Sequence, residues 1–123
     1  MARIFIAEDE PDIRELIEFT LRYGGHEVHS VSNGEEALLE VKKYKPDLIL
    51  LDVRMPVMDG IEVCKRIKAD QDLKNIPVVF LSAKGQTNEI NAGLGAGAVE
   101  YLLKPFAPEE LNKRLREILE RKA

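Results

Sequence analysis

The sequence predicts an α/β fold, a doubly wound parallel sheet of five strands in the order 2-1-3-4-5, of the flavodoxin-like (βα)5 type. Three observations lead to this prediction. Short apolar runs bounded by polar or turn residues are typical of strands buried on both faces. Segments with helical periodicity lie between these runs. The connections are short, and right-handed crossovers with helices on both faces then give this sheet.

Four of the predicted strands end in polar residues suited to phosphate or metal chemistry. The run at 4–7 leads into Glu8 and Asp9, the run at 48–51 into Asp52, the run at 78–81 into Ser82, and the run at 101–103 into Lys104. The remaining strand, near residues 27–31, is only weakly apolar, as a strand at the edge of a sheet can be.

Local signals mark the first two helices. Pro11 suits the first position of a helix, and Gly24 with Gly25 suits its end. Ser32 and Glu35 have the spacing of a capping box at the start of the second helix. The inward stripes are expected to contain Ile13, Leu16, Ile17 and Leu21 in the first helix, and Ala37, Leu38 and Val41 in the second.

The sequence predicts the last three helices with signals of different strength. The third is predicted at about 59–69 with Asp59 as its cap, and the fifth begins at Pro108. The fourth, at 87–96, is weaker because each interior glycine costs about 1 kcal/mol relative to alanine. Gly97 suits the left-handed position after its end. The expected inward residues are Ile61, Cys64 and Ile67 in the third helix, and Leu111, Leu115, Ile118 and Leu119 in the fifth.

Size and composition restrict the function. A chain of 123 residues fits one domain spanning 1–123, and 45% hydrophobic with 33% charged residues is a globular composition. The net charge of −4 argues against a general nucleic-acid-binding surface. No apolar stretch approaches the roughly 20 residues of a membrane span, and we expect no secretory signal. The single cysteine, Cys64, excludes an internal disulfide. We therefore expect a cytoplasmic domain that contacts neither membranes nor nucleic acid.

The polar strand ends should meet at the carboxyl edge of the sheet, where open α/β sheets bind ligands. Three carboxylates, from Glu8, Asp9 and Asp52, would repel one another there unless a cation binds. Carboxylates and waters suit Mg²⁺, which together with Lys104 would bring the site near neutrality. A carboxylate is a competent phosphoryl acceptor, and metal and lysine can neutralise the transferring oxygens. Ser82 can donate a hydrogen bond to one of those oxygens.

These residues resemble those of response-regulator receiver domains of two-component signalling, either the single-domain chemotaxis type or the receivers of winged-helix regulators. The resemblance covers essentially the whole chain. Besides the acidic pair at 8–9, it is carried by three motifs, LILLDVRMP followed by MDG at 48–60, LSAK at 81–84 and YLLKPF at 101–106.

The resemblance implies a role for each acidic residue. Asp52 would be the aspartate that is phosphorylated by a sensor histidine kinase. Asp9, Asp52 and the main-chain carbonyl of Arg54 would bind Mg²⁺ directly, and Glu8 would act through a metal-bound water. Glu8 stands where the family more often has aspartate, so its longer arm is expected to place the carboxylate differently.

The resemblance also implies a switch and an output. Ser82 and Lys104 would contact the phosphoryl group, and Tyr101 would turn inward as Ser82 moves. The surface of the fourth helix, the last strand and the fifth helix would then change and control an effector protein or an output domain outside this chain. We expect a monomer that dimerises on phosphorylation. Arg114 and Arg116 fit the charge-pair network through which winged-helix regulators dimerise, although the acidic and lysine partners are depleted.

Two other functions share this fold. A haloacid-dehalogenase-type phosphatase also uses a strand-end aspartate with Mg²⁺, but it needs an acid two residues later. Arg54 stands at that position, and it cannot protonate a leaving group at neutral pH. A flavodoxin-like mononucleotide binder would have to overcome repulsion between the acids and a nucleotide phosphate. The expected function is therefore a signalling module that promotes only its own phosphorylation and dephosphorylation, and not an enzyme.

Overall fold

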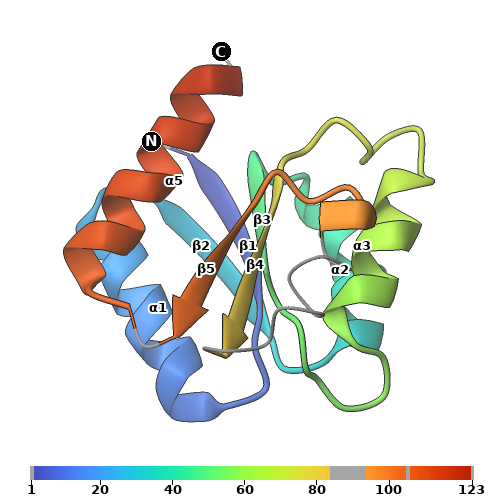
Figure 1. Cartoon of the computed structure of the whole chain (residues 1–123), viewed down its shortest axis with the longest axis horizontal. Coiled ribbons are helices and arrows are strands. Elements are labelled where there is room, and N and C mark those ends of the chain that lie inside the picture. Colours follow the sequence, from blue (N-terminus) through green and yellow to red (C-terminus); the bar gives the residue numbers. More distant parts are fainter. Residues whose placement is uncertain (1, 84–93, 105, 123) are drawn as a thin grey trace.

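The structure is a computed structural model that describes residues 2–83, 94–104 and 106–122. Its centre is a parallel sheet in the order β2-β1-β3-β4-β5, which confirms the predicted fold (Figure 1). The strands are β1 (Arg3–Ala7), β2 (Glu27–Val31), β3 (Leu48–Asp52), β4 (Val78–Ala83) and β5 (Glu100–Lys104). The helices are α1 (Pro11–Tyr23), α2 (Gly34–Tyr44), α3 (Gly60–Lys68) and α5 (Pro108–Lys122). The helix predicted at 87–96 lies mostly outside the described residues.

Two hydrophobic cores, one on each face of the sheet, explain why the strand sequences are continuously apolar. Figure 1 shows α1 and α5 on one face and α2 and α3 on the other. Along β1, Ile4 and Ile6 pack towards α1 and α5, whereas Phe5 and Ala7 belong to the cluster beneath α2 and α3. All five residues of β3 are buried. At about 25 cal/mol per Å² of buried apolar surface, these two cores dominate the stabilisation of the fold.

Two predictions about the helices are wrong. The cap of α2 is Asn33, whose side chain accepts a hydrogen bond of 2.9 Å from the N–H of Glu36. Ser32 instead donates to the carboxylate of Glu36, so the predicted box of Ser32 and Glu35 does not form. Leu16 is 45% exposed rather than buried, because α1 packs through a narrower stripe that includes Ile17 and Leu21. The predicted cap of α3 is confirmed, since Asp59 accepts from the N–H of Glu62.

The weakly apolar strand β2 is an edge strand, as predicted. Polar side chains tie it to the neighbouring helices: Ser30 donates to Glu18 of α1, and His29 lies 2.6 Å from the carboxylate of Glu40 in α2. Within residues 2–83, 94–104 and 106–122, no helix combines the length and the apolar character that a membrane crossing requires.

Candidate functional site

The carboxyl ends of four strands bring the predicted polar residues together at one edge of the sheet. Asp52 ends β3 opposite Leu81, the residue before Ser82 in β4, and Lys104 ends β5 opposite Ala83. Glu8 and Asp9 directly follow β1, which is paired with β3. Residues that are far apart in the chain therefore form a single site because parallel strands end at the same edge.

Lys104 joins two of the acids. Its Nζ lies 2.9 Å from Oε1 of Glu8 and 3.2 Å from Oδ1 of Asp52. The other carboxylate oxygen of Glu8 accepts a hydrogen bond of 3.2 Å from the main-chain N–H of Glu10. The longer arm of glutamate thus brings Glu8 into contact with the lysine and with its own loop.

Burial of the acids shifts pKa values within this cluster. Glu8 is fully buried and Asp52 is 5% exposed. Burial, together with the charge of Glu8, raises the pKa of Asp52 to about 8, although Lys104 acts in the opposite direction. Burial lowers the pKa of Lys104, but its hydrogen bond to Glu8 and the charge of Asp52 outweigh this effect and hold the pKa above its usual range. Additional positive charge would therefore stabilise the ionised site.

The donor set fits a hard divalent cation. One carboxylate oxygen each from Glu8, Asp9 and Asp52 lies within 4.8 Å of the others. Carboxylate oxygens that are completed by water suit the octahedral coordination of Mg²⁺. Arg54, whose carbonyl was predicted as a further ligand, lies in the exposed part of the loop that follows β3.

The predicted switch residues lie on neighbouring strands. Ser82 is buried in β4, beside the strand that ends in Asp52. Tyr101 is half-buried in β5 and packs against the core cluster beneath α2 and α3. Phe80 of β4 is paired with Tyr101 in the sheet register, so the aromatic switch candidate and Ser82 belong to adjacent strands.

Two glycines, to which we assigned no role from the sequence, hold the β3–α3 loop (residues 53–59) in place. A β-carbon on Gly60 would lie 2.2 Å from the carbonyl oxygen of Asp52, and the N–H of Gly60 donates to the carbonyl of Val53. A β-carbon on Gly34, at the start of α2, would lie 2.1 Å from the carbonyl oxygen of Met58. In the sequence Gly60 belongs to the MDG motif, whereas Gly34 carried no such signal, because the predicted cap of its helix was Ser32 rather than Asn33.

The β3–α3 loop contains a strained turn at Val57. The N–H of Met58 donates to the carbonyl of Pro56 over 2.8 Å, which closes a three-residue γ-turn, and Val57 at its centre has φ 71°. Positive φ in such a turn is unfavourable for any L-residue, and a β-branched side chain makes it worse. Val57 is 75% exposed, so its side chain contributes little packing in return.

We expect Val57→Gly to stabilise the protein. Relief of backbone strain contributes on the order of 1–3 kcal/mol, and the greater freedom of glycine in the unfolded chain removes about 0.5–1 kcal/mol. The net gain in the free energy of unfolding should be about 1 kcal/mol by urea titration. Val99→Gly is a matched control, because Val99 is also exposed but lacks positive φ, and it should lose stability. A loss in both variants would contradict the strain argument.

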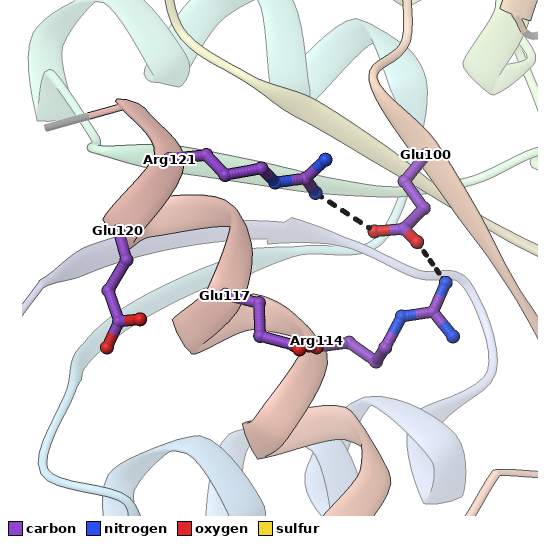
Figure 2. A pocket seen from close by; sticks show the side chains of 5 residues that line it. All are labelled: Glu100, Arg114, Glu117, Glu120 and Arg121. Carbon is purple, nitrogen blue, oxygen red and sulfur yellow. Dashed lines mark hydrogen bonds and ion pairs between the residues drawn. The ribbon is translucent and has the colours of Figure 1, made fainter.

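On the surface formed by β5 and α5, charged side chains form ion pairs with one another (Figure 2). Glu100, the residue before Tyr101, forms ion pairs with Arg114 through one carboxylate oxygen and with Arg121, at 3.6 Å, through the other. Arg116 does not join this cluster. It lines a hollow on another side of α5, near the end of α1, because residues two apart on a helix do not face the same way.

Comparisons with known proteins show the family to which the chain belongs. A family model described as the response regulator receiver domain matches residues 4–116. The alkaline phosphatase synthesis transcriptional regulatory protein PhoP of Bacillus subtilis is 42% identical over 119 residues, which are 97% of this chain and 49% of that protein. The chain spans about half the length of the curated relatives it matches.

Solved structures are similar over nearly the whole chain. A response regulator from Chloroflexus aurantiacus is 39% identical with a TM-score of 0.93, covering 97% of this chain and 98% of that one. The receiver domain of a sensor histidine kinase from Pseudomonas aeruginosa, with a magnesium ion coordinated in its active site cleft, is 32% identical with a TM-score of 0.90. That match covers 97% of this chain and 98% of the other. The chain therefore belongs to the response regulator receiver domains of two-component signalling.

Proposed function

We propose that this chain accepts a phosphoryl group on Asp52 from the phosphohistidine of a sensor histidine kinase. The observation that carries the proposal is the position of the Asp52 carboxylate, which lies within 4.8 Å of oxygens of both acids that follow β1 and 3.2 Å from Nζ of Lys104. In the transfer, an Asp52 oxygen forms a bond to phosphorus while the phosphorus–nitrogen bond to the histidine breaks. The phosphorylated aspartate is then hydrolysed by water at the same site.

Glu8, Asp9, Asp52 and the main-chain carbonyl of Arg54 would hold Mg²⁺, Glu8 through a metal-bound water. The bound ion would neutralise charge on the phosphoryl oxygens. Receiver domains bind Mg²⁺ at an acidic site, and the magnesium-containing receiver from Pseudomonas aeruginosa supports the same use of this cluster. The buried acid pair also favours a cation, because a second positive charge beside Lys104 relieves repulsion between the carboxylates.

The switch would begin with Lys104 and Ser82. Phosphoryl oxygens attract the ammonium of Lys104 away from Glu8 and accept a hydrogen bond from the Ser82 hydroxyl. As Ser82 shifts, Tyr101 moves into the space that it leaves, and the adjoining β5–α5 surface changes. Phosphorylation would thereby favour one of two pre-existing states by its differential interaction energy.

The proposed partners are a sensor histidine kinase and an effector protein or output domain. Receiver domains of this family regulate output domains, and several similar proteins are transcriptional or DNA-binding regulators. We propose that residues 1–123 form the receiver alone, without direct nucleic-acid binding, and that it is a monomer that dimerises on phosphorylation. Receiver domains are generally not true enzymes, so chemistry at Asp52 would be limited to its own phosphorylation and dephosphorylation. A cytoplasmic location also stays a prediction.

Incubation with a small phosphodonor and Mg²⁺, followed by intact-mass measurement, tests the proposal. We expect a phosphate-sized mass gain that requires Mg²⁺ and is abolished in Asp52→Asn. Asp12→Asn is the matched control, since Asp12 is an exposed aspartate in the first turn of α1, and it should keep the gain. A gain that survives Asp52→Asn would refute the assignment. Turnover of a small phosphate ester would indicate a phosphatase instead.

A further inference from the structure

The connection between β1 and α1 consists of residues 8–10, and it supplies two acids of the site, Glu8 and Asp9. Two hydrogen bonds hold this connection in place. The N–H of Glu10 donates to the carboxylate of Glu8 over 3.2 Å. The guanidinium of Arg14, one turn into α1, donates through Nη1 to the main-chain carbonyl of Glu8 over 2.9 Å.

An arginine at position 14 is not explained by helix stability. Cations are unfavourable in the first turns of a helix, where the macrodipole is positive. Within the part of the chain that the structure describes, Arg14 forms no ion pair, and its side chain is half-buried rather than extended into water. Its described polar side-chain contact is therefore the carbonyl of Glu8.

This contact fixes the direction in which Asp9 leaves the strand. The Glu8 carbonyl and the Asp9 N–H belong to one planar peptide group, so a hydrogen bond that holds the carbonyl also sets the orientation of the following Cα. The same bond holds the backbone of Glu8, whose carboxylate contacts Lys104. Arg14 thus acts on both acids of the loop without contacting either carboxylate.

We propose that Arg14 is a positioning residue for the metal site, one that sets the geometry of Glu8 and Asp9 through the Glu8 carbonyl. The inference rests on the proposed binding of Mg²⁺ by these acids. Outer partners that orient metal ligands typically change metal affinity by about 10–100-fold when they are removed.

Whether Mg²⁺ affinity rises or falls when Arg14 is replaced distinguishes a positioning role from an effect of its charge alone. Arg14 carries a positive charge near a cation site, so its removal would strengthen Mg²⁺ binding if electrostatics alone mattered. If Arg14 positions the acids, its removal weakens binding despite the favourable change in charge. Arg14→Lys keeps the charge and much of the aliphatic stem, but its ammonium sits one bond closer to the backbone than the Nη1 that donates to Glu8, so it isolates the geometric contribution.

The test is Mg²⁺ titration by calorimetry of the purified wild type, Arg14→Met, Arg14→Lys and the control Arg22→Met. Arg22 lies on the same helix in an exposed ion pair with Glu18. We expect affinity about 10-fold weaker in both Arg14 variants and unchanged in Arg22→Met. Amide chemical shifts of Glu8, Asp9 and Glu10 in metal-free protein should move in the Arg14 variants only, and thermal melts should show that every variant is folded.

Equal or tighter Mg²⁺ binding by folded Arg14→Lys would overturn the inference while leaving the proposed function intact. Absence of Mg²⁺ binding by the wild type would overturn both. If Arg14→Met fails to fold, Arg14→Lys alone decides, because it preserves charge and packing on α1.

Discussion

Replacing Gly60 with alanine is expected to lower the free energy of unfolding by about 3 kcal/mol. The added β-carbon would lie 2.2 Å from the carbonyl oxygen of Asp52 and 3.2 Å from Cε1 of Phe80. Neither neighbour is the free end of a flexible side chain, since one is the backbone and the other a buried ring. Relief of the overlap requires α3 to move away from the sheet or the carboxyl end of β3 to shift, and either movement displaces the proposed acceptor Asp52.

Thermal and urea unfolding measure this effect, and phosphorylation with a small phosphodonor measures the displacement of Asp52. A loss of this size should lower Tm on the order of 10 °C. Gly95→Ala is the matched control, because a β-carbon there meets nothing within 4 Å. Gly95→Ala should not lower the free energy of unfolding, since alanine favours a helix more than glycine does, and it should leave phosphorylation intact. A Gly60→Ala protein as stable as the wild type would show that the contact is easily relaxed.

Strand order and the position of the site could be predicted because both depend on backbone topology. Continuous apolar runs require burial on both faces, and parallel strands then place Asp52, Ser82 and Lys104 at one edge regardless of side-chain detail. The weakly apolar character of β2 similarly predicted an edge strand. These features follow from the periodicity and length of the segments, which depend only on residues that are close together in the sequence.

What could not be predicted depends on contacts between segments. The reach of Glu8 to Lys104 joins β1 to β5, and the close approach of Gly34 to Met58 joins α2 to the β3–α3 loop. The cap of α2 was missed because Ser32 and Asn33 are both good caps, and the backbone path out of β2 decides which one is used. Helical periodicity overestimated the buried stripe of α1, since it cannot show how closely a helix approaches the sheet.

Asp52→Asn is expected to stabilise the protein at alkaline pH in the absence of Mg²⁺. The pKa of Asp52 is raised from 3.8 to about 8, first by burial and then by the charge of Glu8. Between these values the folded protein keeps a proton that the unfolded chain has released. The free energy of unfolding of the wild type therefore falls as pH rises from about 4 to about 8, and the fall ends above this range.

Asparagine does not titrate, so the stability difference between Asp52→Asn and the wild type should grow between pH 5 and pH 9. Because asparagine also loses the ion pair with Lys104, we expect a difference of about 2 kcal/mol rather than the full value of the shift. Urea titration at both pH values in chelator measures it. Asp12→Asn, at an exposed position, should show no such growth. A wild type more stable than Asp52→Asn at pH 9 would contradict the prediction.

Magnesium should reverse this order of stability. A ligand that binds only the folded state adds about 2.7 kcal/mol at one hundred times its Kd. The wild type gains this amount, which already includes relief of the repulsion between Glu8 and Asp52, whereas Asp52→Asn has lost a charged ligand and gains less. The same carboxylate would thus destabilise the metal-free protein and stabilise the metal-bound one. That reversal is expected only if Asp52 is held in the acidic cluster for binding and chemistry, since burial of a carboxylate for packing would give no such dependence on the ion.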